Sequence, residues 1–160
     1  MSRIYNFIGQ PGSGKTTLAK LLKRAIRIPF SECNILMCID GDDIREIFQN
    51  KDYSENGRRV NIQRAYDIAT FLNAYGIPVI VSLVSPYLDL RENFKKNANV
   101  TEIYVHTTDI RGREEYHVPD FELPLNNYID VDTTNIPVEL SLLKITNAIW
   151  GEGEAIFFDR

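Results

Sequence analysis

The chain has 160 residues, 44% of them hydrophobic and 25% charged, and its formal net charge at pH 7 is −4. This length and composition predict one globular domain over residues 1–160, with room for a substantial core. The acidic balance argues against a long nucleic acid as the main ligand, because phosphate backbones are bound by clustered Lys and Arg. No apolar run is long enough to span a membrane and the N-terminus does not resemble a signal peptide, so we expect a cytoplasmic protein. The two cysteines, Cys33 and Cys38, are expected to be buried thiols.

The clearest motif is GQPGSGKT at residues 9–16, which fits the pattern G-x-x-x-x-G-K-[ST] of phosphate-binding loops. An apolar run typical of a buried strand precedes it, and a segment with helical spacing follows it. Such a strand, loop and helix N-terminus form an anion site at which backbone N–H groups converge. The motif therefore predicts an ATP or GTP site, where Lys15 reaches the β- and γ-phosphates and the Thr16 hydroxyl binds Mg²⁺. The expected nucleotide contacts are Gly9, Gln10, Pro11, Gly12, Ser13, Gly14, Lys15, Thr16 and Thr17.

A cluster of acids follows the second predicted strand, residues 34–39. In an open parallel sheet, ligands bind outside the carboxyl ends of the strands, so acids at this point are well placed for chemistry on a bound phosphate. Asp40 is the first candidate for orienting an acceptor hydroxyl and a metal-bound water, and Asp42 is the second. An alternative is that Asp42 or Asp43 merely caps the following helix. That alternative is weak for Asp40, because Asp40 ends the strand itself.

The rest of the chain alternates between helical and strand-like segments. This alternation predicts an α/β fold of the P-loop NTPase type, a three-layer sandwich in which a parallel sheet of about five strands carries helices on both faces. The strand-like run at 77–84 is the most apolar and is expected at the centre of the sheet. Residues 109–127 show no period and contain two prolines, as expected of a mobile lid. The other predicted elements are helices at 44–49, 56–75, 88–98 and 137–150, strands at 103–106 and 128–133, and a tail at 151–160 that would dock on the sheet edge or on a partner.

Several segments in order resemble the adenylylsulfate (APS) kinase family, which phosphorylates the 3′-hydroxyl of adenosine 5′-phosphosulfate with ATP. Residues 9–17 match its phosphate loop, and residues 40–45, DGDDIR, match its D-G-D-x-[IV]-R segment. The pattern F-S-x-x-x-R-x-x-N-x-x-R is present with Tyr in place of Phe, and S-x-x-S-P-Y-x-x-x-R follows it. A Y-E-x-P-like element precedes the last strand. The residues that carry these three matches are Tyr53, Ser54, Arg58, Asn61, Arg64, Ser82, Ser85, Pro86, Tyr87, Arg91 and Phe121 to Pro124.

The resemblance implies a set of acceptor contacts. Arg45, Arg58 and Asn61 would grip the phosphosulfate and ribose, and Tyr53 would pack on the adenine. Arginine suits this task because its planar fork pairs with oxyanions at two points. Ser85 would lie at the acceptor end of the third strand. The remaining assignments are Asp42 in the acceptor site, Mg²⁺ on Thr16 and Asp40, ATP as co-substrate, and a homodimer, because dimers occur in the family.

The predicted lid departs from the family. The family carries a longer lid with an R-D-x-K-G-L-Y run and an F-T-G turn, and neither is intact in residues 109–127. The resemblance implies that Arg111 or Arg113 takes the place of the lid arginine that stacks on adenine. A shorter lid should enclose the acceptor less completely, so we expect weaker APS binding or looser acceptor choice. Two alternatives therefore stay open: a kinase acting on another nucleotide derivative or modified nucleoside, and a nucleotide-binding regulatory module without turnover.

Overall fold

A parallel sheet of five strands forms the centre of the protein, whose computed structural model describes residues 3–26 and 35–152. The strand order is β2-β3-β1-β4-β5, and every neighbouring pair is parallel. The predicted α/β fold is therefore confirmed. β1 is the central strand, so the expectation that the run at 77–84 lies there is wrong, and β3 sits one place nearer the edge. The strands are β1 Ile4–Ile8, β2 Met37–Asp40, β3 Val79–Ser82, β4 Val100–His106 and β5 Tyr128–Asp132.

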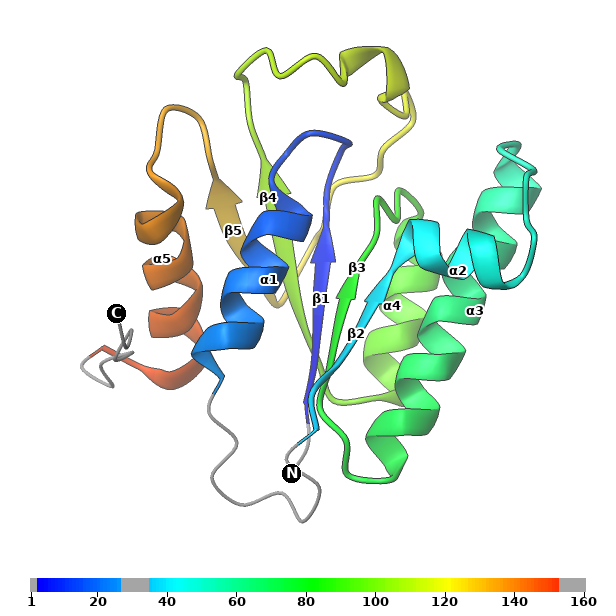
Figure 1. Ribbon diagram of the computed structural model, residues 1–160, viewed down its shortest axis with the longest axis horizontal. Helices are drawn as coiled ribbons and strands as arrows, with labels where there is room; N and C mark the ends of the chain where they lie inside the picture. Colours follow the sequence, from blue (N-terminus) through cyan, green and yellow to red (C-terminus); the bar gives the residue numbers. More distant parts are fainter. Residues whose placement is uncertain (1–2, 27–34, 153–160) are drawn as a thin grey trace.

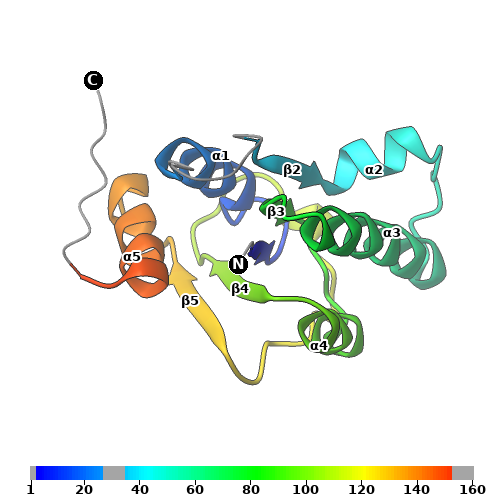
Figure 2. The ribbon, with the colours of Figure 1, turned by 90° about the horizontal axis from the view of Figure 1, so that it is seen from below.

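Helices cover both faces of the sheet (Figure 1). Figure 2 shows α1 and α5 on one face and α3 and α4 on the other. Within the described residues, no helix has the length and apolar character needed to cross a membrane. The helices are α1 Lys15–Ala25, α2 Gly41–Ile47, α3 Glu55–Ala74, α4 Leu88–Asn97 and α5 Val138–Trp150, with a 3₁₀ turn, η1, at Glu114–Tyr116.

The core consists of two apolar layers, one on each face of the sheet. Successive side chains of a strand point to opposite faces. Accordingly, Tyr5 and Phe7 of β1 pack with α1 and α5, whereas Ile4 packs with α3 and α4. Asn6 is the polar exception in β1, and its amide donates a hydrogen bond to the hydroxyl of buried Tyr66 (3.1 Å). The sheet is thus anchored to α3 by packing and by a buried polar contact.

β2 differs from the sequence-based expectation because it lies at the edge of the sheet and pairs only with β3. Met37 is 39% exposed, and Cys38 is an exposed free thiol. The expectation that Cys38 is buried is therefore wrong, because an edge strand is covered on fewer sides than a central one. Cys33 lies outside the described residues, as does most of the tail at 151–160.

A buried ion pair, with a lysine beside it, connects the loop after β3 to β4. Arg91 of α4 and Glu102 of β4 are both 0% exposed, with Arg91 Nε 3.0 Å from Glu102 Oε1. Lys95 Nζ lies 2.9 Å from the other Glu102 oxygen. The Arg91 guanidinium also donates to the carbonyls of Ser85 (2.6 Å) and Glu122. One buried cation therefore holds the loop after β3 together with the segment that precedes β5.

Replacing Glu102 by Leu should strongly destabilise the fold. The substitution leaves Arg91 buried without a counter-charge, and breaking a buried pair in this way costs about 3–5 kcal/mol. Urea denaturation should register this as a fall in the free energy of unfolding. Glu92→Gln is the matched control, since the partly exposed Glu92–Lys95 pair should contribute about 1 kcal/mol or less. A loss below about 1 kcal/mol for Glu102→Leu would contradict this account.

Candidate active site

The phosphate loop connects the carboxyl end of β1 to the start of α1. Residues 109–127, hereafter the lid, begin at this same end of the sheet and then return to the start of β5 (Figure 1). Gly9 adopts φ 144°, and a Cβ placed on it would lie 2.0 Å from the Val105 carbonyl oxygen. Only glycine is compatible with this approach of the loop to β4. The predicted strand–loop–helix context of the motif is therefore present in the fold.

Lys15 is largely enclosed by this loop. The side chain is buried, with 8% exposure, and its ammonium donates a hydrogen bond to the Gln10 carbonyl at 2.7 Å. Burial lowers the pKa of Lys15 to about 8, because desolvation disfavours the charged form. Asp40 and Asp42 oppose this shift of the pKa, and Arg113 adds to it.

The two carboxylate oxygens of Asp40 make different hydrogen bonds. Its Oδ1 accepts from the Asp42 N–H at 3.0 Å, which makes Asp40 the N-cap of α2. Its Oδ2 accepts from the Thr16 hydroxyl at 3.4 Å. The capping alternative therefore applies to Asp40, where the sequence indicated it least. The hydroxyl and carboxylate are hard oxygen ligands of the kind that Mg²⁺ prefers. Within the described residues, no group of three or more His, Cys, Asp and Glu is arranged to hold a metal ion.

A cavity of about 510 Å³ opens above the phosphate loop, and we call it the donor cavity. It contains most of the predicted nucleotide contacts, but Gly9, Gln10 and Ser13 do not line it. Gln10 turns its side chain toward the lid, and buried Ser13 accepts a hydrogen bond from Thr133 Oγ1 on its carbonyl. The lining residues are Pro11, Gly12, Gly14, Lys15, Thr16, Thr17, Asp40, Gly41, Asp42, Ser82, Leu83, Val84, Arg111 and Arg113.

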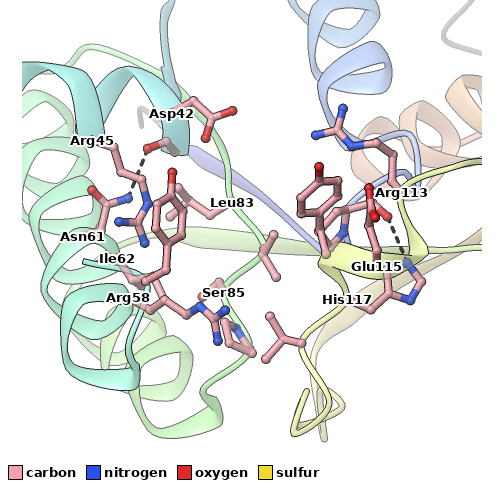
Figure 3. A pocket seen from close by; sticks show the side chains of 17 residues that line it. Asp42, Arg45, Arg58, Asn61, Ile62, Leu83, Ser85, Arg113, Glu115 and His117 are labelled. Carbon is pink, nitrogen blue, oxygen red and sulfur yellow. Dashed lines mark hydrogen bonds between the residues drawn. The ribbon is translucent and has the colours of Figure 1, made fainter. Parts of the chain in front are cut away.

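A second cavity of about 620 Å³ adjoins the first, and we call it the acceptor cavity. Figure 3 shows its two walls, with Arg45, Arg58 and Asn61 on one side and the lid residues on the other. Every residue predicted to contact the acceptor lines it. The lining comprises Pro11, Gly41, Asp42, Arg45, Tyr53, Arg58, Asn61, Ile62, Leu83, Val84, Ser85, Pro86, Arg113, Glu115, Tyr116, His117 and Val118.

The residues of the helical wall are held by contacts with the backbone and with one aromatic ring. Arg45 donates to the Asp52 carbonyl (2.8 Å), and its guanidinium lies 4.2 Å from the centre of the Tyr53 ring. Asn61, 5% exposed, donates to the Gly41 carbonyl at 3.1 Å. Its Oδ1 is buried and has no hydrogen-bond partner. Asn61 is thus fixed in the wall by its amide nitrogen, and its buried oxygen has no partner among the described residues.

Two other residues of the matched motifs make their main side-chain contacts within the protein. Ser85 lines the acceptor cavity with φ 44°, but its hydroxyl is 2.7 Å from the buried Tyr66 hydroxyl. Burial raises the pKa of Tyr66 to about 12, so the phenol keeps its proton. Arg64 does not line either cavity and lies over the Phe48 ring at 4.5 Å. Only part of the matched pattern thus faces the acceptor cavity.

The structure separates the two lid arginines, which the sequence left equivalent. Arg111 donates to the carbonyls of Gly12 (3.3 Å), Ser13 (3.2 Å) and Thr133 (3.0 Å), and pairs with Asp109. Its guanidinium is therefore occupied by the protein itself. Arg113 lines both cavities and, among the described residues, forms no ion pair; its guanidinium lies 5.6 Å from the Tyr116 ring centre.

Sequence reasoning missed much of the lid wall. Glu115, Tyr116, His117 and Val118 line the acceptor cavity, but the predicted sites in this segment were the two arginines alone. The only signal for these residues was their proximity in sequence to Arg113. Irregular segments carry no period from which the direction of a side chain can be predicted.

Comparison with known proteins identifies the family. The sequence model of the adenylylsulphate kinase family matches residues 1–115. The chain belongs to this family. It is therefore a P-loop phosphotransferase with a hydroxyl acceptor and a member of a nucleotide kinase family, which confirms the predicted enzyme class over a regulatory module.

Two relatives and one solved structure illustrate the similarity. A cytidine diphosphoramidate kinase of Campylobacter jejuni is 30% identical over 129 residues, covering 78% of this chain and 74% of the relative. An adenylyl-sulfate kinase of Rippkaea orientalis is 29% identical over 157 residues, covering 86% and 85%. The APS kinase of Mycobacterium tuberculosis in complex with AMPPNP and APS aligns with a TM-score of 0.72 at 19% identity, over 92% of this chain and 97% of the other. At that identity the structural match shows the shared fold.

The lowered pKa of Lys15 predicts a pH dependence of ATP binding. A protonated Lys15 attracts phosphate and a neutral amine does not, so ATP affinity should fall as the pH rises through about 8. The charged fraction in the free protein drops from about 90% at pH 7 to about 10% at pH 9, which corresponds to about a tenfold loss of affinity. Calorimetric titration with a non-hydrolysable ATP analogue would measure it.

Lys15→Arg is the control for this titration, because arginine stays charged over the whole range. Its affinity for the analogue, whatever its absolute value, should not change between pH 7 and pH 9. A wild-type affinity that is equally flat over that interval would show that Lys15 keeps an ordinary pKa.

Proposed function

We propose that this protein transfers the γ-phosphoryl group of ATP to the 3′-hydroxyl of adenosine 5′-phosphosulfate. The observation that carries the proposal is that the donor and acceptor cavities meet, with Asp42 and Arg113 lining both. A kinase needs two substrates with their reacting atoms adjacent, since phosphoryl transfer is mostly positioning and charge neutralisation. The family match and the adenylyl-sulfate kinase relative support APS as the acceptor.

The phosphate loop would bind the donor. The N–H groups at the start of α1 and the Lys15 ammonium would hold the β- and γ-phosphates. Thr16 and Asp40, whose oxygens are 3.4 Å apart, would hold Mg²⁺, which when bound neutralises charge on the phosphate oxygens. Arg113 would stabilise the transferred group from the lid side, because among the described residues it is the lid arginine that forms no ion pair.

Asp42 would orient the acceptor hydroxyl. It lines both cavities, whereas Asp40 lines only the donor cavity and uses its two oxygens on Thr16 and on the α2 N-terminus. This assignment reverses the preference for Asp40 that the sequence suggested. In the reaction, the acceptor oxygen forms a bond to the γ-phosphorus as the bond to the β–γ bridging oxygen breaks. ADP leaves, and the hydroxyl proton passes to the carboxylate of Asp42.

The helical wall would recognise the rest of the acceptor. Arg45 and Arg58 present two guanidinium groups to the cavity, as an acceptor bearing a phosphosulfate requires. Asn61 lines the same cavity and would contribute a polar amide beside the two arginines. Tyr53, 64% exposed, offers a ring face on which a base can stack.

A second acceptor is supported by a specific observation. The relative from Campylobacter jejuni that is 30% identical is a cytidine diphosphoramidate kinase. Its substrate, like APS, is a ribonucleoside whose 5′-phosphate carries a further acidic group, so the same arginines could hold either. The two differ mainly in the base. The short lid, which departs from the pattern of APS kinases, favours a difference at that position.

An acceptor panel tests the proposal. ATP would be supplied with APS, cytidine diphosphoramidate, CDP, AMP or adenosine, and ADP release and the phosphorylated products would be measured. A kcat/KM for APS at least about tenfold above the others supports APS kinase activity. A comparable preference for cytidine diphosphoramidate would replace the proposal with the second candidate. Absence of any phosphorylated product would overturn both.

Arg58→Ala and Asn61→Ala should weaken the acceptor far more than ATP. The two residues lie one turn apart on α3 and line the acceptor cavity only. Loss of a buried charge-assisted contact costs about 2–5 kcal/mol, so KM for the acceptor should rise by more than tenfold. Arg64→Ala, on the same helix but outside both cavities, is the matched control. If ATP affinity fell and acceptor affinity did not, these residues would belong to the donor site.

A further inference from the structure

Gln10 connects the phosphate loop to the lid through a pair of hydrogen bonds. Its Nε2 donates to the Val118 carbonyl at 2.7 Å, and its Oε1 accepts from the Val118 N–H at 2.9 Å. The side-chain amide thus satisfies both backbone groups of a residue 108 positions away in the sequence. Gln and Asn are the side chains that carry a primary amide, which offers a donor and an acceptor on one planar group, and Asn is one methylene shorter.

The same residue contacts the donor lysine through its backbone. The Gln10 carbonyl accepts from Lys15 Nζ at 2.7 Å. Its side chain, however, does not line the donor cavity. Gln10 therefore touches the phosphate-binding lysine with its main chain and the lid with its side chain, which places it between the two functional parts of the site.

Both ends of the lid wall are attached to the phosphate loop. At one end, Arg111 donates to the carbonyls of Gly12 and Ser13. At the other end, buried Val118 is held by Gln10, and the adjacent His117 ring lies 3.2 Å from the Pro11 carbonyl oxygen, to which its Nε2 donates. Arg113, Glu115 and Tyr116 lie between these two attachments and form the lid side of the acceptor cavity together with His117 and Val118.

We propose that Gln10 is a positioning residue that makes the donor loop and the acceptor wall move as one unit. The inference rests on the proposed function, because it assigns the donor and the acceptor to these two cavities. Since coupling between two binding sites is reciprocal, ATP bound on the loop raises acceptor affinity and the acceptor raises ATP affinity. The lid is shorter than the family pattern and has fewer residues with which to enclose the acceptor. Its hydrogen bonds to the phosphate loop therefore hold the lid wall in position.

The test uses substitutions that remove the amide and keep the length of the side chain. Gln10→Met has neither hydrogen-bonding group, and Gln10→Glu keeps the oxygen but sets a carboxylate against the Val118 carbonyl. Gln63→Met is the matched control, because Gln63 is a helix-surface residue whose amide donates to Asp67 (2.8 Å), away from both cavities. Thermal unfolding of all three variants would verify that each is folded.

The first measurement needs no acceptor. Amide hydrogen exchange of Val118 should be at least about tenfold faster in Gln10→Met and Gln10→Glu than in wild type, and unchanged in Gln63→Met. A non-hydrolysable ATP analogue should slow exchange across residues 112–118 in wild type and not in Gln10→Met. Equal protection of Val118 in wild type and Gln10→Met would overturn the proposal, whatever the protein phosphorylates.

The second measurement uses the acceptor that proves active in the panel. In wild type, the ATP analogue should tighten acceptor binding by about fivefold or more, and this factor should approach one in Gln10→Met. At saturating concentrations of the other substrate, KM for the acceptor and KM for ATP should each rise about fivefold in that variant, because the lost coupling factor applies to both substrates. Faster exchange of Val118 with an unchanged coupling factor would show a merely structural contact, and the proposal would be wrong.

Discussion

The arrangement of this protein depends on the parallel pairing of its strands. β1 pairs with β3 on one side and β4 on the other. Because every pair is parallel, the carboxyl ends of all five strands lie at the same end of the sheet. The phosphate loop, the acidic turn at Asp40, the loop at Ser85 and the lid each follow the carboxyl end of a strand. Backbone pairing therefore brings four segments together that are far apart in sequence, before any of their side chains make contact.

Buried polar contacts then hold these segments at fixed distances. Arg91 joins the loop after β3 to the residues before β5, and Asn6 and Ser85 both bond to Tyr66. Each of these contacts is costly to break, because an unpaired polar group inside a protein retains its full desolvation penalty. The floor of the acceptor cavity is thus held by buried polar contacts, whereas its lid wall is held by hydrogen bonds to the phosphate loop.

The two arginines of the lid differ in how many of their hydrogen-bond donors are already bonded within the protein, and this difference indicates which of them can contact a substrate. Arg111 donates hydrogen bonds to carbonyls of the phosphate loop and to the carbonyl of Thr133, so its role is to hold the lid in place. Arg113 lies at the junction of the cavities without an acidic partner among the described residues. A similar distinction separates Asp40, which caps α2, from Asp42, which faces both cavities. In each pair, the member with free hydrogen-bonding capacity is the better candidate for contact with substrate.

The sequence by itself determined the fold class and the phosphate loop, which follow from glycine spacing in the loop and apolar periodicity in the strands. The acceptor contacts Arg58 and Asn61, one turn apart on α3, were expected from the resemblance of their segment to a known family. Only the tertiary structure decided the strand order, the exposure of Cys38 and the contact between Gln10 and Val118. Strand order and long-range contacts depend on which distant segments pair. Periodic patterns along the chain predict single helices and strands, but they do not indicate which of these elements pair with each other.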